Sequence, residues 1–136
     1  MSLVLPVIDD LNRPFWDGCR TGVLRLQRCA RCSRLRYPVA AVCPRCLSTE
    51  AAWEQVSGRG EVFSFVVFRH AYNEAWRDRL PYCVALVRLE EGPIVIGNVL
   101  GAEPEAIHVG LPVRAVFEVV TEEVSRPGFE PDEGGR

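Results

Sequence analysis

Two Cys-x-x-Cys pairs constrain this chain more than any other feature of its sequence. Cys29 and Cys32 form the first pair, and Cys43 and Cys46 follow after ten intervening residues. Each pair predicts a tight knuckle that directs two thiolates at one point, and four sulfur ligands in a tetrahedral array suit Zn²⁺. Because four protein ligands leave no open position, we expect a structural zinc, or iron in its place, that does not activate water.

Two other chemistries of these cysteines fit the sequence less well. Disulfides are typical of secreted chains, whereas residues 1–10 have neither the basic region nor the apolar core of a signal peptide. A thioredoxin-like pair needs a strand before it and a helix after it, but these pairs lie in a short segment rich in Arg and Pro. Since no apolar run approaches the ~20 residues of a membrane span, we expect a soluble, cytoplasmic protein without a membrane partner.

The charge is divided unevenly along the chain. All sixteen basic residues are arginine; residues 1–46 hold eight of them against three acids, and residues 47–136 hold eight against fifteen acids. The arginines near the cysteines either offset the negative charge of a thiolate metal centre, which we favour, or form an anion-binding face. They are Arg28, Arg31, Arg34, Arg36 and Arg45.

Composition and pattern divide the chain into four predicted segments. They are an N-terminal helical segment (1–22), a zinc ribbon (23–52), a β barrel (53–124) and a tail (125–136). A helix is predicted over 9–22, with Pro14 in its first turn and Gly22 at its end. The tail holds two Pro and three Gly, which predict disorder.

Period-two hydrophobic patterns predict the strands of the barrel. The expected strands are Glu61–Phe68, Tyr82–Leu89, Ile94–Leu100 and Val113–Val120, with Trp53–Val56 counted as a candidate part of the first. One helical turn before the last strand fits a five-stranded Greek-key barrel of OB type, whereas an Ig-like sandwich usually needs more strands. The predicted fold class is therefore mainly β, with an N-terminal helix, a zinc ribbon and an OB barrel.

Two of these strands are apolar on both faces. In a small barrel one face of each strand fills the interior and the other should be polar, yet Glu61–Phe68 and Ile94–Leu100 carry apolar residues at both alternating sets of positions. The helix and the ribbon of the same chain can cover only part of the outer side. We therefore favour a partner-protein interface there.

The inventory of residues for catalysis is small. Neither His70 nor His108 lies in a known nucleophile motif, and no Gly-rich loop that could hold a phosphate precedes a helix. We assign no catalytic residue, and we expect Cys19 and Cys83 to be core residues. In OB barrels a long loop such as 69–81 often borders the ligand face. The candidate substrate or interface residues are His70, Tyr72, Trp76, Tyr82, Phe15 and Trp16.

A set of short motifs carries a resemblance to a known family. They are Pro14-Phe15-Trp16, Gly22–Cys29 with Cys32, Tyr37-Pro38, Cys43–Cys46, Trp53, Gly58–Val62, Pro81-Tyr82, Val87–Leu89 and Gly110–Val113. Through these motifs, from about residue 10 to 120, the chain resembles the zinc-ribbon/OB-fold, acyl-CoA-associated proteins long catalogued as a domain of unknown function. Ser33 and Leu47 depart from the family, which tends to have Gly after each knuckle, and Val39 stands where a second Pro is common. Gly relieves the strain of a positive φ, so these departures bear on how tightly the metal is held.

The resemblance implies both a fold and a function. The fold is an N-terminal helix, a rubredoxin-like zinc ribbon and an OB barrel with one structural Zn²⁺. The function is that of a non-catalytic accessory subunit, required by a thiolase-fold partner that carries the catalytic residues: a thiolase, an acyltransferase like hydroxymethylglutaryl-CoA synthase, or an aldolase of steroid side-chain breakdown. Such subunits are thought to help complete the acyl-CoA site, and some also occur with hydratases of the MaoC type.

Two functions of other classes remain as alternatives. Zinc ribbons and OB barrels often bind single-stranded nucleic acid, but a net charge of −2 and an acidic barrel half would repel phosphates. A free-standing acyl-CoA binder or enzyme is the other alternative, and the absence of an acid/base set argues against it.

Overall fold

The computed structural model describes residues 5–71 and 74–132, with the side chains of residues 75 and 76 outside the description. Its elements are α1 (Arg13–Thr21), β1 (Leu24–Cys29), β2 (Leu35–Arg36), β3 (Ala51–Val56), β4 (Arg59–Phe68), the 3₁₀ helix η1 (Glu74–Arg79), β5 (Tyr82–Leu89), β6 (Ile94–Val99), the 3₁₀ helix η2 (Pro104–Ala106), β7 (Pro112–Val119) and β8 (Ser125–Pro131). β2, β1 and β3 form a three-stranded ribbon, and β4-β5-β6-β8-β7 close into a barrel. The predicted mainly β class is confirmed. None of the described helices is long and apolar enough to cross a membrane.

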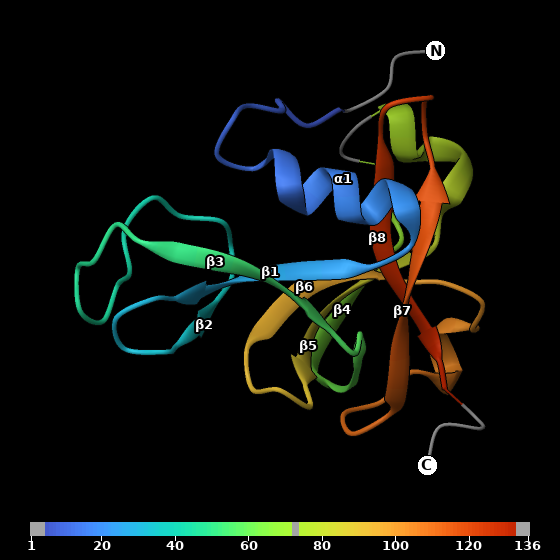
Figure 1. Cartoon of the computed structure of the whole chain (residues 1–136). Helices are drawn as coiled ribbons and strands as arrows, with labels where there is room; N and C mark the ends of the chain where they lie inside the picture. The colour runs from blue at the N-terminus through green and yellow to red at the C-terminus, as the bar shows by residue number, and fades with distance from the viewer. Residues whose placement is uncertain (1–4, 72–73, 133–136) are drawn as a thin grey trace.

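Helix α1 lies between the ribbon and the barrel. It packs on β1 of the ribbon and on β7 and β8 of the barrel (Figure 1). Its start is later than the predicted residue 9, because Asp9 and Asn12 form a turn in which each side chain accepts the other's backbone N–H, at 2.8 and 2.9 Å. The helix ends as predicted at Gly22, which adopts the left-handed conformation with φ +86°.

The ribbon includes a strand that the sequence assigned to the barrel. β3 pairs with β1 over its whole length, from Leu24 opposite Val56 to Cys29 opposite Ala51. The candidate assignment of Trp53–Val56 to the first barrel strand was therefore wrong. The chain leaves the ribbon at Gly58, whose φ of +78° turns it into β4.

The barrel has the strand order and directions of an OB fold. β6 and β8 are parallel, and the other neighbours are antiparallel. Val62, Val87 and Val95 lie directly opposite one another and are buried in the interior. A bulge between Val62 and Ser64 changes the alternation of β4. Because of this bulge two successive residues, Phe63 and Ser64, both lie on the outer side, where the Arg88 guanidinium sits 4.6 Å above the ring of Phe63.

The predicted disordered tail instead supplies the fifth strand. β8 pairs with β7 along its length, from Val119 opposite Ser125 to Val113 opposite Pro131. Phe129 is only 2% exposed and fills the barrel interior. Its ring lies against Gly97, where a Cβ would come within 3.1 Å of it. Burial of this ring is the physical reason that the tail is ordered despite its Pro and Gly content.

The prolines of β8 are tolerated because of where their missing N–H groups would point. The carbonyl of Phe129 accepts from Leu100 N–H at 2.7 Å, on the β6 side of β8. Backbone groups of a strand alternate in direction, so Pro127 and Pro131 also face the β6 side and leave the bonds to β7 intact. Accordingly, β8 pairs with β6 only at Gly128 and Phe129.

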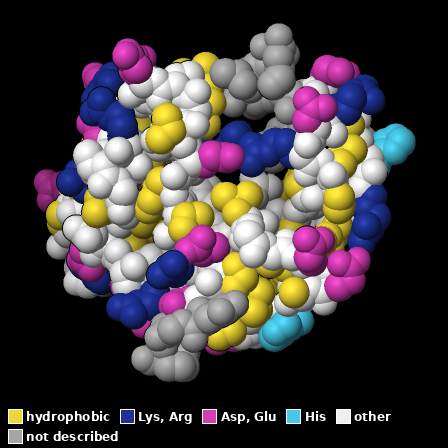
Figure 2. Space-filling view, turned by 90° about the vertical axis from the view of Figure 1, so that its right-hand side faces the viewer, with side chains coloured by type: hydrophobic (Ala, Val, Ile, Leu, Met, Phe, Trp, Pro, Cys, Tyr) yellow, Lys and Arg dark blue, Asp and Glu magenta, His cyan; other side chains and the backbone are white. Residues whose placement is uncertain are grey.

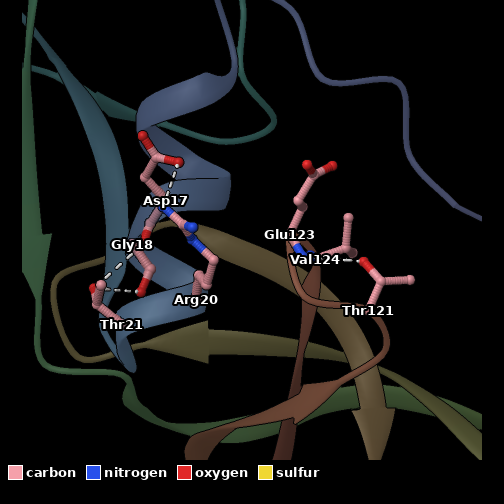
Figure 3. Close-up of polar contacts among 7 residues, drawn as sticks. All are labelled: Asp17, Gly18, Arg20, Thr21, Thr121, Glu123 and Val124. Atoms are coloured by element: carbon pink, nitrogen blue, oxygen red, sulfur yellow. Dashed lines mark hydrogen bonds and ion pairs between the residues drawn. The ribbon is translucent and has the colours of Figure 1, made fainter.

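The turn before β8 is fixed by its own side chains. Thr121 Oγ1 accepts from the backbone N–H groups of Glu123 and Val124, at 3.2 and 3.1 Å. Figure 3 shows this turn together with the C-terminal part of α1, where the Thr21 hydroxyl donates to the carbonyl of Gly18. Such local bonds favour a tight reversal, which returns the chain onto β7 as β8.

Truncation of Phe129 tests the role of the tail. We expect Phe129→Ala to lower the free energy of unfolding by about 3–5 kcal/mol, the usual cost of emptying a buried aromatic site. Urea unfolding followed by tryptophan fluorescence measures this. Val119→Ala, at a side chain that is 77% exposed, is the control and should change it by less than about 0.5 kcal/mol. Equal stability of the two variants would contradict a folded β8.

Candidate metal centre

The two knuckles repeat each other bond for bond. In the first, Ser33 N–H donates to the carbonyl of Cys29 at 3.0 Å, and in the second, Leu47 N–H donates to that of Cys43 at 2.9 Å. The backbone N–H of Cys29 donates to the carbonyl of Arg34, and that of Cys43 donates to the carbonyl of Ser48, at 2.9 Å in both cases. Ser33 and Leu47 accordingly share a left-handed conformation, with φ of 68° and 66°.

The four sulfur atoms converge as a tetrahedral metal requires. They all lie within 4.8 Å of one another, and none is in a disulfide. Cys29 Sγ and Cys46 Sγ are 3.5 Å apart, and Cys32 Sγ and Cys43 Sγ are 3.7 Å apart. A Zn–S distance of about 2.3 Å gives sulfur–sulfur edges of about 3.8 Å in a tetrahedron. The donor set therefore fits a structural Zn²⁺ with no open ligand position.

The backbone of each knuckle stabilises the thiolate form of its first cysteine. The N–H groups of Cys32 and Arg31 donate to Cys29 Sγ, each at 3.4 Å. These bonds lower the pKa of Cys29 to about 6. Bonds from the backbone of Cys46 and Arg45 likewise lower the pKa of Cys43. The first cysteine of each knuckle is therefore favoured as the thiolate, the form that binds metal. Cys46 differs: a bond from the backbone of Ser48 lowers its pKa, but burial and the neighbouring sulfurs raise it to about 11, so zinc must displace its proton.

Two of the five nearby arginines have structural roles of their own. Arg28 forms a two-bond pair with Glu54, at 2.6 and 2.8 Å, and also donates to the carbonyl of Ser33 at 2.6 Å. It therefore braces the end of the first knuckle. Arg36 is only 6% exposed and donates to the carbonyl of Ala40 at 2.9 Å, which holds the loop that leads to the second knuckle.

The two remaining cysteines are buried and outside the metal centre. Cys19 lies in α1 and Cys83 in β5, and both belong to the hydrophobic core. Burial raises the pKa of Cys19 to about 12 and also raises that of Cys83. Both are core residues, as expected. Their raised pKa values contrast with the lowered pKa of Cys29 in the metal centre.

The other predicted site residues fall into separate regions. Phe15 is buried, with Trp16 edge-on to it at 5.1 Å and Tyr37 of the ribbon at 6.3 Å, so this pair joins the helix to the ribbon. His70 is exposed in the bend after β4, and Tyr82 begins β5. Tyr72 lies outside the described residues, as does the side chain of Trp76.

Tyr82 lines a hollow at one end of the barrel. Its ring stacks on Phe68 at 5.1 Å. The hollow has a volume of about 320 Å³ and lies between η1, β5, β6 and the segment that contains η2. Cys83, Asn98 and Ile107 are among its other lining residues. Its lining is mixed, and the role that the sequence predicted for Tyr82 remains a prediction.

Sequence reasoning missed a contact that fixes the ribbon on the barrel. The Glu91 carboxylate in the β5–β6 turn accepts from the backbone N–H of Ser57 at 2.7 Å and from its hydroxyl at 3.3 Å. No local signal in the sequence pointed to a bond across 34 positions. Tyr37 adds a second contact, since its partly buried phenol lies against the backbone of Ile96.

Comparison with known families matches both parts of the chain. Residues 16–51 match the family described as "ChsH2, rubredoxin-like zinc ribbon domain", and residues 53–118 match "ChsH2, C-terminal OB-fold domain". A DUF35 domain-containing scaffold protein of Methanocaldococcus jannaschii is 32% identical over 77% of this chain and 72% of its own length. The predicted family and zinc-ribbon/OB architecture are thus confirmed.

Two further relatives are named for enzymes. The 3-oxo-4,17-pregnadiene-20-carboxyl-CoA hydratase alpha subunit of Mycobacterium tuberculosis is 41% identical over 88% of this chain. The chain spans only 39% and 37% of the lengths of the two hydratase alpha subunits that it matches. A solved structure titled "Ltp2-ChsH2(DUF35) aldolase" has 34% identity and a TM-score of 0.83, over 93% of this chain and 98% of that chain.

Removal of a ligand tests the metal centre. We expect Cys29→Ser and Cys46→Ser each to abolish stoichiometric zinc and to unfold the ribbon, because metal binding contributes roughly 10–16 kcal/mol in comparable zinc peptides. Metal analysis of the purified protein and far-UV circular dichroism measure the two effects. Cys19→Ala, outside the centre, should keep its zinc. An unchanged zinc content in either serine variant would contradict the four-cysteine assignment.

Acidification gives a second test of the same centre. The pKa of Cys29 is about 6 in the folded chain, below the ordinary value of about 8.5. The stability that this shift contributes is therefore fully present when the pH is above the ordinary pKa, and it is lost as the pH falls through the pKa of the folded chain. With zinc bound, we expect metal release to begin only below about pH 6, followed with a chromogenic chelator. Release between pH 7 and 8 would contradict the lowered pKa of Cys29.

Proposed function

Because the chain belongs to the ChsH2/DUF35 family of zinc-ribbon and OB-fold proteins, we propose that it is a non-catalytic accessory subunit of a thiolase-fold enzyme. In this role the partner supplies the catalytic residues. This chain supplies a rigid surface that stabilises the complex and helps to form the partner's acyl-CoA site.

The observation that carries this proposal is an uncovered hydrophobic surface on the barrel. Its exposed side chains are Phe63, Val66, Leu86 and Ile96, which we call the outer apolar face. Leu86 of β5 lies directly opposite Ile96 of β6 on one side and Ser64 of β4 on the other. Val66 is two residues beyond Ser64 in β4, so its side chain points to the same face. Val66 is 54% exposed and Ile96 is 50% exposed. The face thus spans three adjacent strands.

This face is not required by the chain's own core. The opposite sides of the same strands already fill the barrel, since Val87, Leu89 and Val95 are buried. A contiguous exposed patch of large apolar side chains is a common mark of a protein–protein interface. It supports the interface that the two-faced strands predicted, although the bulge in β4 changes which residues form it.

The names of the relatives guide the choice of partner. One solved relative is titled "Ltp2-ChsH2(DUF35) aldolase", and others are named as hydratase alpha subunits of greater length. We propose a thiolase-fold enzyme, such as a thiolase, an acyltransferase or a steroid side-chain aldolase, as the direct partner. A MaoC-type hydratase is proposed as a further member of the complex.

A nucleic-acid-binding role has weaker support. Figure 2 shows the side of the barrel that is turned away from the ribbon, where acidic and basic side chains are intermixed around hydrophobic ones. Binding of a single strand favours a continuous basic groove with stacked aromatics. On this side of the barrel the intermixed charges fit such a groove poorly.

Isolation of the native complex tests the proposed function. The tagged chain is expressed in its native host, captured at low salt and analysed by mass spectrometry. We expect recovery of a thiolase-fold protein in a fixed ratio to this chain. Nucleic acid in the eluate without a protein partner would support a binding module instead. Acyl-CoA turnover by the isolated chain would support a free-standing enzyme.

Charge substitutions on the outer apolar face give a sharper test. We expect Val66→Asp combined with Ile96→Asp to abolish recovery of the partner, because two carboxylates would be desolvated at the interface. Zinc content and the thermal midpoint should change little, since both side chains face outward. Val119→Asp, on the exposed end of β7, is the matched control. Full recovery by the double variant would show that the partner binds elsewhere.

A further inference from the structure

Leu47 at the tip of the ribbon is both strained and exposed. Its φ of 66° lies in the left-handed region, which disfavours side chains with a Cβ. A glycine would adopt this conformation without strain and would keep the Leu47 N–H bond to Cys43. The side chain is 74% exposed, so little burial within the chain offsets the strain. An interaction outside the chain would account for a leucine at this position.

The surroundings of Leu47 add a second apolar side chain and a set of free cations. Val42, at the other end of the second knuckle, is also exposed. Arg31 lies in the first knuckle, Arg34 follows it, and Arg45 lies in the second, all three exposed. None of these three takes part in an ion pair between described residues, whereas eight other arginines do. We call Val42, Leu47, Arg31, Arg34 and Arg45 the ribbon tip.

The ribbon tip is positively charged even with its metal. Residues 23–52 contain six arginines and one glutamate. Four thiolates and one Zn²⁺ carry a charge of −2, which offsets only part of this excess. Arg28 already donates to the carboxylate of Glu54, and Arg36 donates to the carbonyl of Ala40, both within the ribbon. The three exposed arginines are therefore available to an outside partner.

The tip is also held rigidly and away from the barrel. Figure 1 shows the ribbon projecting beyond the barrel wall, with the loops of the two knuckles at its far end. The paired bonds of the knuckles and the metal fix the backbone there. A rigid surface loses little conformational freedom on docking, so an apolar anchor presented this way suits a protein interface.

We infer that the ribbon tip is a docking surface for the partner subunit, separate from the outer apolar face, with Leu47 inserted into an apolar hollow that has an acidic rim. This inference rests on the proposed function. An apolar anchor surrounded by cations is the pattern of a protein hot spot with electrostatic steering. Phosphate groups of a coenzyme would use the arginines alone and would gain nothing from Leu47 or Val42.

Leu47→Gly separates docking from structure. The purified thiolase-fold partner is titrated with the zinc-loaded chain by biolayer interferometry at two salt concentrations. We expect Leu47→Gly to raise Kd at least about tenfold, while zinc content stays full and the thermal midpoint is equal or higher. Val109→Gly, at an exposed residue outside any strand, is the control and should leave Kd unchanged. A purely structural role of Leu47 would leave binding unchanged or improve it.

The arginines are tested in the same assay. Arg31→Gln combined with Arg45→Gln should weaken binding and make it less sensitive to salt. Arg20→Gln, at an exposed arginine paired with Asp17, is the control. If the Leu47 and arginine variants bind the partner normally while the Val66→Asp/Ile96→Asp variant does not, this inference is overturned and the proposed function stands. Coenzyme A binding to the isolated chain that the arginine variant abolishes would also overturn it. If no thiolase-fold protein binds even the unmodified chain, the proposed function fails first and this inference with it.

Discussion

The convergence of four thiolates on one point is the constraint on which the ribbon depends. The ribbon has almost no core of its own, because its buried residues Leu24, Leu26 and Leu35 belong to a cluster shared with the helix and the barrel. Its far end holds only knuckle loops, whose conformation is set by short backbone bonds and by the metal. Zinc therefore determines whether this end of the protein has a defined surface at all.

A single continuous core then fixes that surface relative to the barrel. Helix α1 packs on both units, Glu91 bonds to Ser57 at their junction, and Tyr37 reaches the backbone of Ile96. An accessory subunit that completes another enzyme's site needs such rigidity, because its contacts must be in place before substrate binds. The outer apolar face and the ribbon tip are thus presented in one fixed geometry.

Features that depend on residues close together in the sequence could be predicted from the sequence. The Cys-x-x-Cys spacing predicted the knuckles, and a glycine predicted the helix end at Gly22. The period-two hydrophobic pattern predicted most of the barrel strands. What could not be predicted depends on distant partners. β8 looked like a tail because its Pro and Gly residues weaken any strand signal. The space that Phe129 occupies depends on Gly97 of the neighbouring strand β6, which is distant in the sequence. Likewise, the bulge that brings Ser64 and Val66 to the same outer side as Phe63 becomes visible only in the pairing with β5.

The most direct test of the account is the affinity of coenzyme A for the partner enzyme, measured by calorimetry with and without this chain. If the chain helps to form the acyl-CoA site, the complex should bind coenzyme A at least about tenfold more tightly than the partner alone. The isolated chain should show no saturable binding. Equal affinity of the complex and the partner alone would contradict the claim that this chain contributes to the site.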